Sequence, residues 1–360
     1  MAPDSPPVAL LQGMPDTQGG PAPDHGRGPG GPPEPGRGRT QLLSGRWLMP
    51  TLERYAVVAV WGLMIAFYSA IEPSRFATSG TFQTIFSSQA ALVFLSMAFL
   101  CTVIVGEFVD LSVASILGLC ATIVPVLTVL HHMNVWLASV ISLAVGVAAG
   151  AVNGILVVVV GVNIIVVTLG MSTLLLGIGL AISHLYTVSG LSASYAKLAL
   201  YSIGGLPISF YYGVAIVLVF AYVLAFTPLG RHMQFVGSNR EVSRLAGIRV
   251  NRVRFGAFVM AGLLCGLGGV VVTAGLGGFD PSSSATYLLP TVSAVFLGTA
   301  MIAPGRFNPI GTFIGVYFLA TGILGLQELG SGGWISDVFY GAALIIAVSL
   351  STVIRRRTSA

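Results

Sequence analysis

Long apolar runs follow one another along most of this chain, and short polar turns separate them. Many of the runs cover about 17 to 25 residues, the length that a helix needs to cross a hydrocarbon core of about 30 Å. Only 8% of the 360 residues are charged, whereas about a quarter are charged in an ordinary soluble domain. The sequence therefore predicts an all-α polytopic protein of the cell membrane.

The hydropathy pattern predicts ten transmembrane helices. They cover about residues 54–71, 82–104, 111–130, 135–160, 164–186, 210–226, 253–276, 287–302, 310–325 and 335–353. Proline interrupts the run at 287–302 most, because Pro290 lies in its first turn and Pro304 follows its end.

The basic residues predict the orientation, because cytosolic flanks of spanning helices are rich in Arg and Lys. With the N-terminus inside, the cytosolic side receives nearly all of them: Arg46, Arg54, the segment 227–254, Arg306 and Arg355 to Arg357. Only Arg75 and Lys197 fall outside. Ten spans, with the N- and C-termini both cytosolic, fit this distribution. The net charge of +5 then reflects membrane topology, and we expect no nucleic-acid partner.

Residues 1–45 differ from the rest of the chain in composition. They are rich in Pro and Gly and contain few large apolar residues, which is typical of a disordered tail. They lack the basic start and the apolar core of a signal peptide. We expect a cytosolic tail over 1–45 and one transmembrane domain over 46–360.

The segment 237–254, "GSNREVSRLAGIRVNRVR", carries five arginines. Ser238 and Glu241 have the spacing of a capping box, and Gly247 stands where a short helix would end. Helical spacing places Val242 and Leu245 on one face. The pattern predicts a short amphipathic helix within a cytosolic loop at 227–254. A simpler interpretation is a loop whose arginines contact lipid headgroups.

Four stretches together resemble the ribose-type permeases of ATP-binding-cassette (ABC) importers. They are the basic segment from Leu229, "VDLSVASILGL" (109–119), "VNGILVVVVGVNIIVVTLGMSTLLLGI" (152–178) and "FLGTAMIAPGRFNPIGTFIG" (296–315). In the basic segment the family pattern is matched by Leu229, Gly230, Arg231, Gly237, Asn239, Gly247 and Ile248. The resemblance covers about residues 55–353.

Two stretches depart from the family pattern. Before Leu-Ser the family has Gly-Gly-x-Asp, whereas this chain has Gly106-Glu107-Phe108-Val109-Asp110. Ala303 and Pro304 replace glycines further on. We interpret Asp110 as a cap of the helix that follows it, and Glu107 as a candidate partner for a basic residue.

The resemblance implies that the chain is a membrane permease subunit and not an enzyme. It implies three partners: a separate ATPase, an extracytoplasmic substrate-binding protein, and a second permease copy or similar chain. Lys197, the only lysine, follows Ala196, so the chain has no G-x-x-x-x-G-K-[ST] phosphate loop. We therefore expect no cofactor in this chain, and ATP and Mg²⁺ on the ATPase. Coupling to that ATPase is predicted for Ser238, Asn239, Arg240, Glu241, Arg244, Leu245 and Gly247.

Three alternatives remain open from the residues alone. An ion-coupled secondary carrier or channel commonly buries ionisable groups near mid-membrane, and the predicted spans place none securely there. An exporter of the same superfamily would need no binding protein. An intramembrane enzyme is disfavoured, because no H-E-x-x-H or G-x-S-x-G motif occurs. Since Cys101, Cys120 and Cys265 all lie in apolar runs, we predict no metal site and no disulfide.

A small, mildly polar stripe is the candidate substrate path. Thr168 and Ser172 share one helical face with Gly179 and Ser183, within an arc of roughly 60°. Gln89 and Asn153 are predicted to face the same space, which would suit a small sugar. The alternative is that these polar residues bond neighbouring helices. Small residues at helical spacing predict close helix contacts instead: Gly146, Gly150, Gly154, Gly262 and Gly266.

Overall fold

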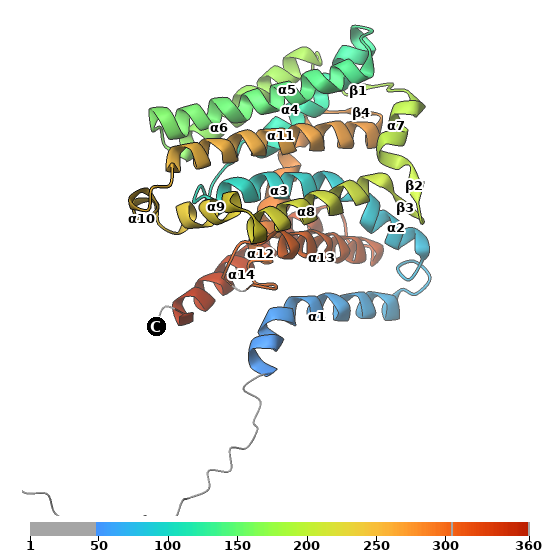
Figure 1. The fold of residues 1–360 in the computed structure, drawn as a ribbon. Helices are drawn as coiled ribbons and strands as arrows, with labels where there is room; N and C mark the ends of the chain where they lie inside the picture. Colours follow the sequence, from blue (N-terminus) through green and yellow to red (C-terminus); the bar gives the residue numbers. More distant parts are fainter. Residues whose placement is uncertain (1–47, 304, 359–360) are drawn as a thin grey trace, which may run out of the picture. The chain divides into compact units, whose positions relative to one another are not determined.

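A computed structural model describes residues 48–303 and 305–358, with side chains over 57–303 and 305–349. The predicted tail at 1–45 lies outside the described residues. Within them the chain is almost entirely helical (Figure 1). The main helices are α1 (Leu48–Ile71), α2 (Ser79–Ser88), α3 (Ala90–Ile104), α4 (Val113–Pro125), α5 (Val135–Gly154), α6 (Ile164–Ile182), α8 (Ile208–Phe226), α11 (Val250–Leu276), α12 (Leu288–Gly298), α13 (Pro309–Glu328) and α14 (Trp334–Thr358).

Shorter elements join these helices. They are the π-helical turns η1 (Val126–Leu130) and η2 (Ile155–Val160), the 3₁₀ helix η3 (Pro281–Tyr287), and the short helices α7 (Ala193–Leu200), α9 (Pro228–Ser238) and α10 (Arg240–Leu245). Strand β1 (Val188–Ser189) pairs antiparallel with β4 (Gly278–Phe279), and β2 (Ser202–Ile203) pairs with β3 (Leu206–Pro207).

Seven helical segments of the described chain are long and apolar enough to cross a membrane. They are 79–104, 113–130, 135–160, 164–182, 208–226, 250–276 and 309–328. Shorter apolar stretches lie at 57–71 and 334–349. The predicted all-α polytopic membrane fold is thereby confirmed in its coarse form, and nine of the ten predicted spans coincide with one of these stretches.

The predicted helix at 287–302 is wrong in its bounds. Helix α12 ends at Gly298, and its 11 residues extend only about 16 Å, which is too short to cross alone. The 3₁₀ helix η3 precedes it, and residues 299–303 turn before α13. Pro290 itself is accommodated, because its missing N–H falls in the first helical turn, where no intrahelical acceptor exists.

Helix α11 lies at the centre of the packing, against α5, α3 and α4 (Figure 1). Glycines allow α5 and α11 to approach closely: a Cβ on Gly150 would meet the carbonyl of Phe258, and one on Gly262 would meet that of Gly146. The predicted close contacts through these small residues are confirmed. A second group forms where α12 packs on α13, α14 and α3.

Candidate functional site

Helix α10 stands at the ends of α9 and α11 (Figure 1). Its N-cap is Asn239, whose Oδ1 accepts hydrogen bonds from the amides of Glu241 (3.0 Å) and Val242 (3.1 Å). The predicted cap at Ser238 is wrong, because Ser238 is the last residue of α9 and its Oγ donates to the carbonyl of Gln234. The extended backbone of Asn239 separates the two helices, and Asn is as good an N-cap as Ser.

Gly247 ends this helix, as predicted. Its φ of +81° is a left-handed conformation that favours glycine. The amide of Gly247 donates to the carbonyl of Arg244, and that of Ile248 donates to Ser243, both at 3.0 Å. The predicted short helix is therefore present, between a polar cap and a glycine stop.

The apolar residues of α10 face away from the rest of the chain. Leu245 is 88% exposed and Val242 is 58% exposed, whereas Ser243 between them is buried. Glu241 and Arg244 form an exposed pair at 3.6 Å. Val242 and Leu245 thus form an apolar face of α10 that no other part of the described chain covers.

An open pocket of about 430 Å³ adjoins the exposed face of α10. Its lining is Arg244, Ile248, Arg249, Val250, Asn251 and Arg252. Among the described residues, Arg249 and Arg252 have no carboxylate within salt-bridge distance. The surface beside Leu245 is thus strongly basic.

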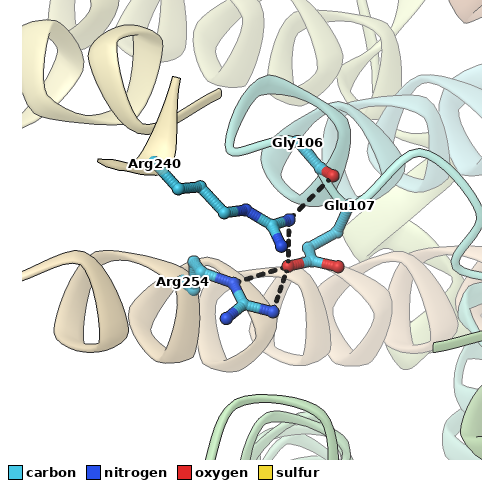
Figure 2. Close-up of polar contacts among 4 residues, drawn as sticks. All are labelled: Gly106, Glu107, Arg240 and Arg254. Carbon is cyan, nitrogen blue, oxygen red and sulfur yellow. Dashed lines mark hydrogen bonds and ion pairs between the residues drawn. The ribbon is translucent and has the colours of Figure 1, made fainter. Parts of the chain in front are cut away.

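A buried carboxylate holds the base of α10 (Figure 2). Oε1 of Glu107 accepts hydrogen bonds from Nη2 of Arg240 at 2.8 Å and from Nε of Arg254 at 2.6 Å, and Nη2 of Arg254 forms an ion pair with the same oxygen at 2.6 Å. Arg240 also donates to the carbonyl of Gly106 at 3.0 Å. Glu107 is only 4% exposed, so these ion pairs are poorly screened. The expected pairing of Glu107 with a basic residue is confirmed, and the structure shows two such partners.

Close backbone packing accompanies this cluster. A Cβ on Gly237, at the end of α9, would meet the carbonyl of Ile104 at the end of α3. Only glycine therefore lets α9 lie against the turn that carries Glu107. Gly237 in the sequence is compatible with a close backbone contact, but the sequence does not indicate that the end of α3 is its partner.

Asp110 begins a second polar network beside the first. Its Oδ1 accepts from both the amide (3.1 Å) and the hydroxyl (2.7 Å) of Ser112, at the start of α4. Asn153 of α5 donates to Ser112 Oγ at 2.7 Å. Burial raises the pKa of Asp110, and the charge of Glu107 raises it further, while the Ser112 bonds lower it. The predicted cap at Asp110 is wrong, because the N-cap of α4 is Ser112; Asp110 bonds to that N-cap residue and not to an amide inside the helix.

The structure shows different surroundings for the four predicted substrate-path residues. Asn153 and Thr168 are fully buried, and Thr168 Oγ1 donates to the carbonyls of Ile164 (2.9 Å) and Val109 (3.4 Å). Ser172 shares a 2.7 Å hydrogen bond with Ser115 of α4. Gln89 lies at the break between α2 and α3, and its Nε2 donates to Ser88 Oγ. The bonds of Asn153, Thr168 and Ser172 connect α5 and α6 to α4 or to the loop before it, whereas Gln89 lies apart from them, and a role in transport stays a prediction.

Known proteins are similar to this chain over most of its length. The family described as "Branched-chain amino acid transport system / permease component" matches residues 81–348. The ribose import permease protein RbsC of Escherichia coli (strain K12) is 29% identical over 319 residues, which are 86% of this chain and 97% of that protein.

Two further relatives carry other substrates in their names. The D-allose transport system permease protein AlsC of Escherichia coli (strain K12) is 27% identical, over 84% of this chain and 93% of that protein. The autoinducer 2 import system permease protein LsrC of Enterobacter sp. (strain 638) is 30% identical, over 88% of this chain and 89% of that protein. No solved structure matches the chain.

Proposed function

Because the chain belongs to the family of branched-chain amino acid transport system permease components, we propose that it forms the translocation path for a small sugar or sugar-like solute. It does so as the membrane subunit of an ABC importer. Ribose, D-allose and autoinducer 2 appear in the names of its relatives, which favours a small polyhydroxylated solute. Gln89, Asn153, Thr168 and Ser172 are the residues we propose to line or border the path.

The observation that carries this proposal is the uncovered face of α10. Leu245 is 88% exposed, and burying a leucine side chain contributes about 1.5–3 kcal/mol. The adjoining pocket is lined by Arg244, Arg249 and Arg252. We propose that a separate ATPase subunit covers this face, with an apolar socket for Leu245 and acidic groups for the arginines.

Energy must then come from that partner, since this chain has no phosphate-binding loop. Lys197 is the only lysine and follows Ala196, so the Walker-type lysine has no counterpart. ATP and Mg²⁺ are expected on the ATPase, and an extracytoplasmic binding protein would deliver the solute. A second permease copy, or a similar chain, would complete the path.

The proposed topology has ten passages and both termini in the cytosol. In this arrangement α10 and the arginines around it lie on the cytosolic side, together with Arg306, while Lys197 lies outside. The bias agrees with the distribution of basic residues in membrane proteins. For the passage through α12, we propose that η3 completes the crossing, since 3₁₀ helices rise about 2.0 Å per residue.

The experiment that tests the proposal is copurification of tagged full-length chain from its native cells in mild detergent. Wild type should carry an ATPase, identified by mass spectrometry. Leu245→Asp should reduce the ATPase by about tenfold or more, because it places a charge in the centre of the interface. Leu200→Asp is the matched control, because Leu200 is also exposed (55%) but lies in α7. An ATPase retained equally by both variants would contradict the docking assignment.

A further inference from the structure

One carboxylate joins three segments that are far apart in the sequence (Figure 2). Glu107 follows α3, Arg240 is the first residue of α10, and Arg254 lies in the first turns of α11. We propose that Glu107 is the positioning residue through which movement of α10 reaches α3 and α11. This inference rests on the proposed docking of an ATPase on α10.

Helix α10 has few other attachments to the packed helices. Its main neighbours are α9 and the start of α11, which are also its own chain connections. Ser243, its buried side chain, bonds back to the carbonyl of Asn239 within the same turn. Contact with the turn after α3 passes through Arg240, which reaches both Glu107 Oε1 and the carbonyl of Gly106.

The geometry makes this attachment stiff. Arg254 directs two donors at the same oxygen, and its side chain is 13% exposed, so its guanidinium has little freedom to move. Arg240 approaches that oxygen from α10. Since both arginines share one oxygen, α10 cannot shift relative to α11 without stretching a charge-assisted bond or carrying Glu107 with it.

The attachment also connects to the second polar network. Glu107 and Asp110 lie in the same loop between α3 and α4, and the bonds of Asp110 continue through Ser112 to Asn153 on α5. A displacement of Glu107 would therefore act on the start of α4 and on the end of α5. Glu107 is among the residues by which this segment departs from the family pattern, so the pattern alone does not supply the attachment.

The test uses Glu107→Gln and Arg240→Gln, with Arg306→Gln as matched control. Arg306 is an exposed arginine outside the cluster, so Arg306→Gln removes the same positive charge as Arg240→Gln without touching Glu107. In the purified full chain, amide hydrogen exchange over residues 241–248 should accelerate by about tenfold in both cluster variants, because local opening becomes easier. The control should match wild type.

Transmission is measured in the copurified complex with the ATPase. A reporter cysteine, Gln89→Cys in a background with the three native cysteines replaced by alanine, is labelled with a small maleimide with and without MgATP. In wild type MgATP should change the labelling rate by about threefold or more, as expected for a two-state rearrangement. In Glu107→Gln and Arg240→Gln the change should be lost while the ATPase remains bound, because Leu245 is untouched.

Each remaining outcome decides the inference. A full MgATP response with normal α10 protection in Glu107→Gln would overturn it, and so would loss of the ATPase from that variant, since Glu107 would then only shape the docking surface. If Glu107→Gln does not fold, Arg240→Gln gives the same readings. An ATPase absent from wild type would instead remove the proposed function, which the copurification reveals separately.

Discussion

The carboxylate of Glu107 and the guanidinium of Arg254 lie 2.6 Å apart, although 147 positions separate them in the chain. Both side chains are largely buried. The free-energy cost of desolvating such a pair is about as large as the gain from its electrostatic attraction. The pair therefore contributes more to the geometry of the fold than to its net stability. This pair fixes the turn after α3 against α11, and Arg240 attaches α10 to the same point.

Removing Arg254 should destabilise the protein more than removing Arg240. Arg254 is 13% exposed and Arg240 is 40% exposed, so only the first loss leaves Glu107 without its most shielded partner. We expect Arg254→Gln to cost about 2 kcal/mol and Arg240→Gln about 1 kcal/mol. Thermal unfolding in detergent measures the stability of both variants, and equal midpoints for Arg254→Gln and Arg240→Gln would contradict this prediction.

Adding a single methyl group at the contact between α5 and α11 should destabilise the protein. In Gly262→Ala the new Cβ would meet the carbonyl of Gly146, so the helices must separate, at a cost of about 1–3 kcal/mol. Gly256→Ala is the matched control on the same helix, with nothing within 4 Å of the new Cβ. It should be neutral or stabilising, because alanine favours the helix. Thermal midpoints that fall equally in both variants would refute the packing argument.

The buried carboxyl of Asp110 should make stability depend on pH. Burial raises its pKa in the folded protein, whereas an unfolded Asp titrates near about 3.9. The protonated form therefore favours folding below the unfolded pKa, and this contribution is lost as pH rises through the folded pKa. Compared with Asp110→Asn, which cannot titrate, wild type should lose thermal stability over that window. A constant difference between the two melting midpoints from about pH 4 to about pH 8 would contradict the assignment.

The proposed topology predicts opposite labelling of two introduced cysteines. Cys101, Cys120 and Cys265 are buried, so wild type should not react with a membrane-impermeant maleimide. Lys197→Cys should react in right-side-out vesicles and Leu245→Cys only in inside-out vesicles, since basic segments stay cytosolic. Labelling of both sites from the same side would reject the topology.

Much of the helical framework is readable from local sequence. Apolar length alone predicts segments such as 135–160 and 208–226, because a run of that length must satisfy its backbone hydrogen bonds internally in a membrane. Gly247 marks the end of α10 because few residues other than glycine adopt its left-handed backbone readily. The end of α12 at Gly298 was missed, since the apolar pattern continues through Ala300 and Met301 into the turn.

Taken alone, the sequence determined the apolar segments, their basic flanks and the presence of a short capped helix, because these depend on composition and on neighbours within a few positions. Tertiary structure decided which residues meet. Asn239 and not Ser238 caps α10 because α9 continues through Ser238. Glu107 selects Arg240 and Arg254 from the arginines of the segment because only these two reach the turn after α3. The pairing of Glu107 follows from how distant helices pack, which no local pattern encodes.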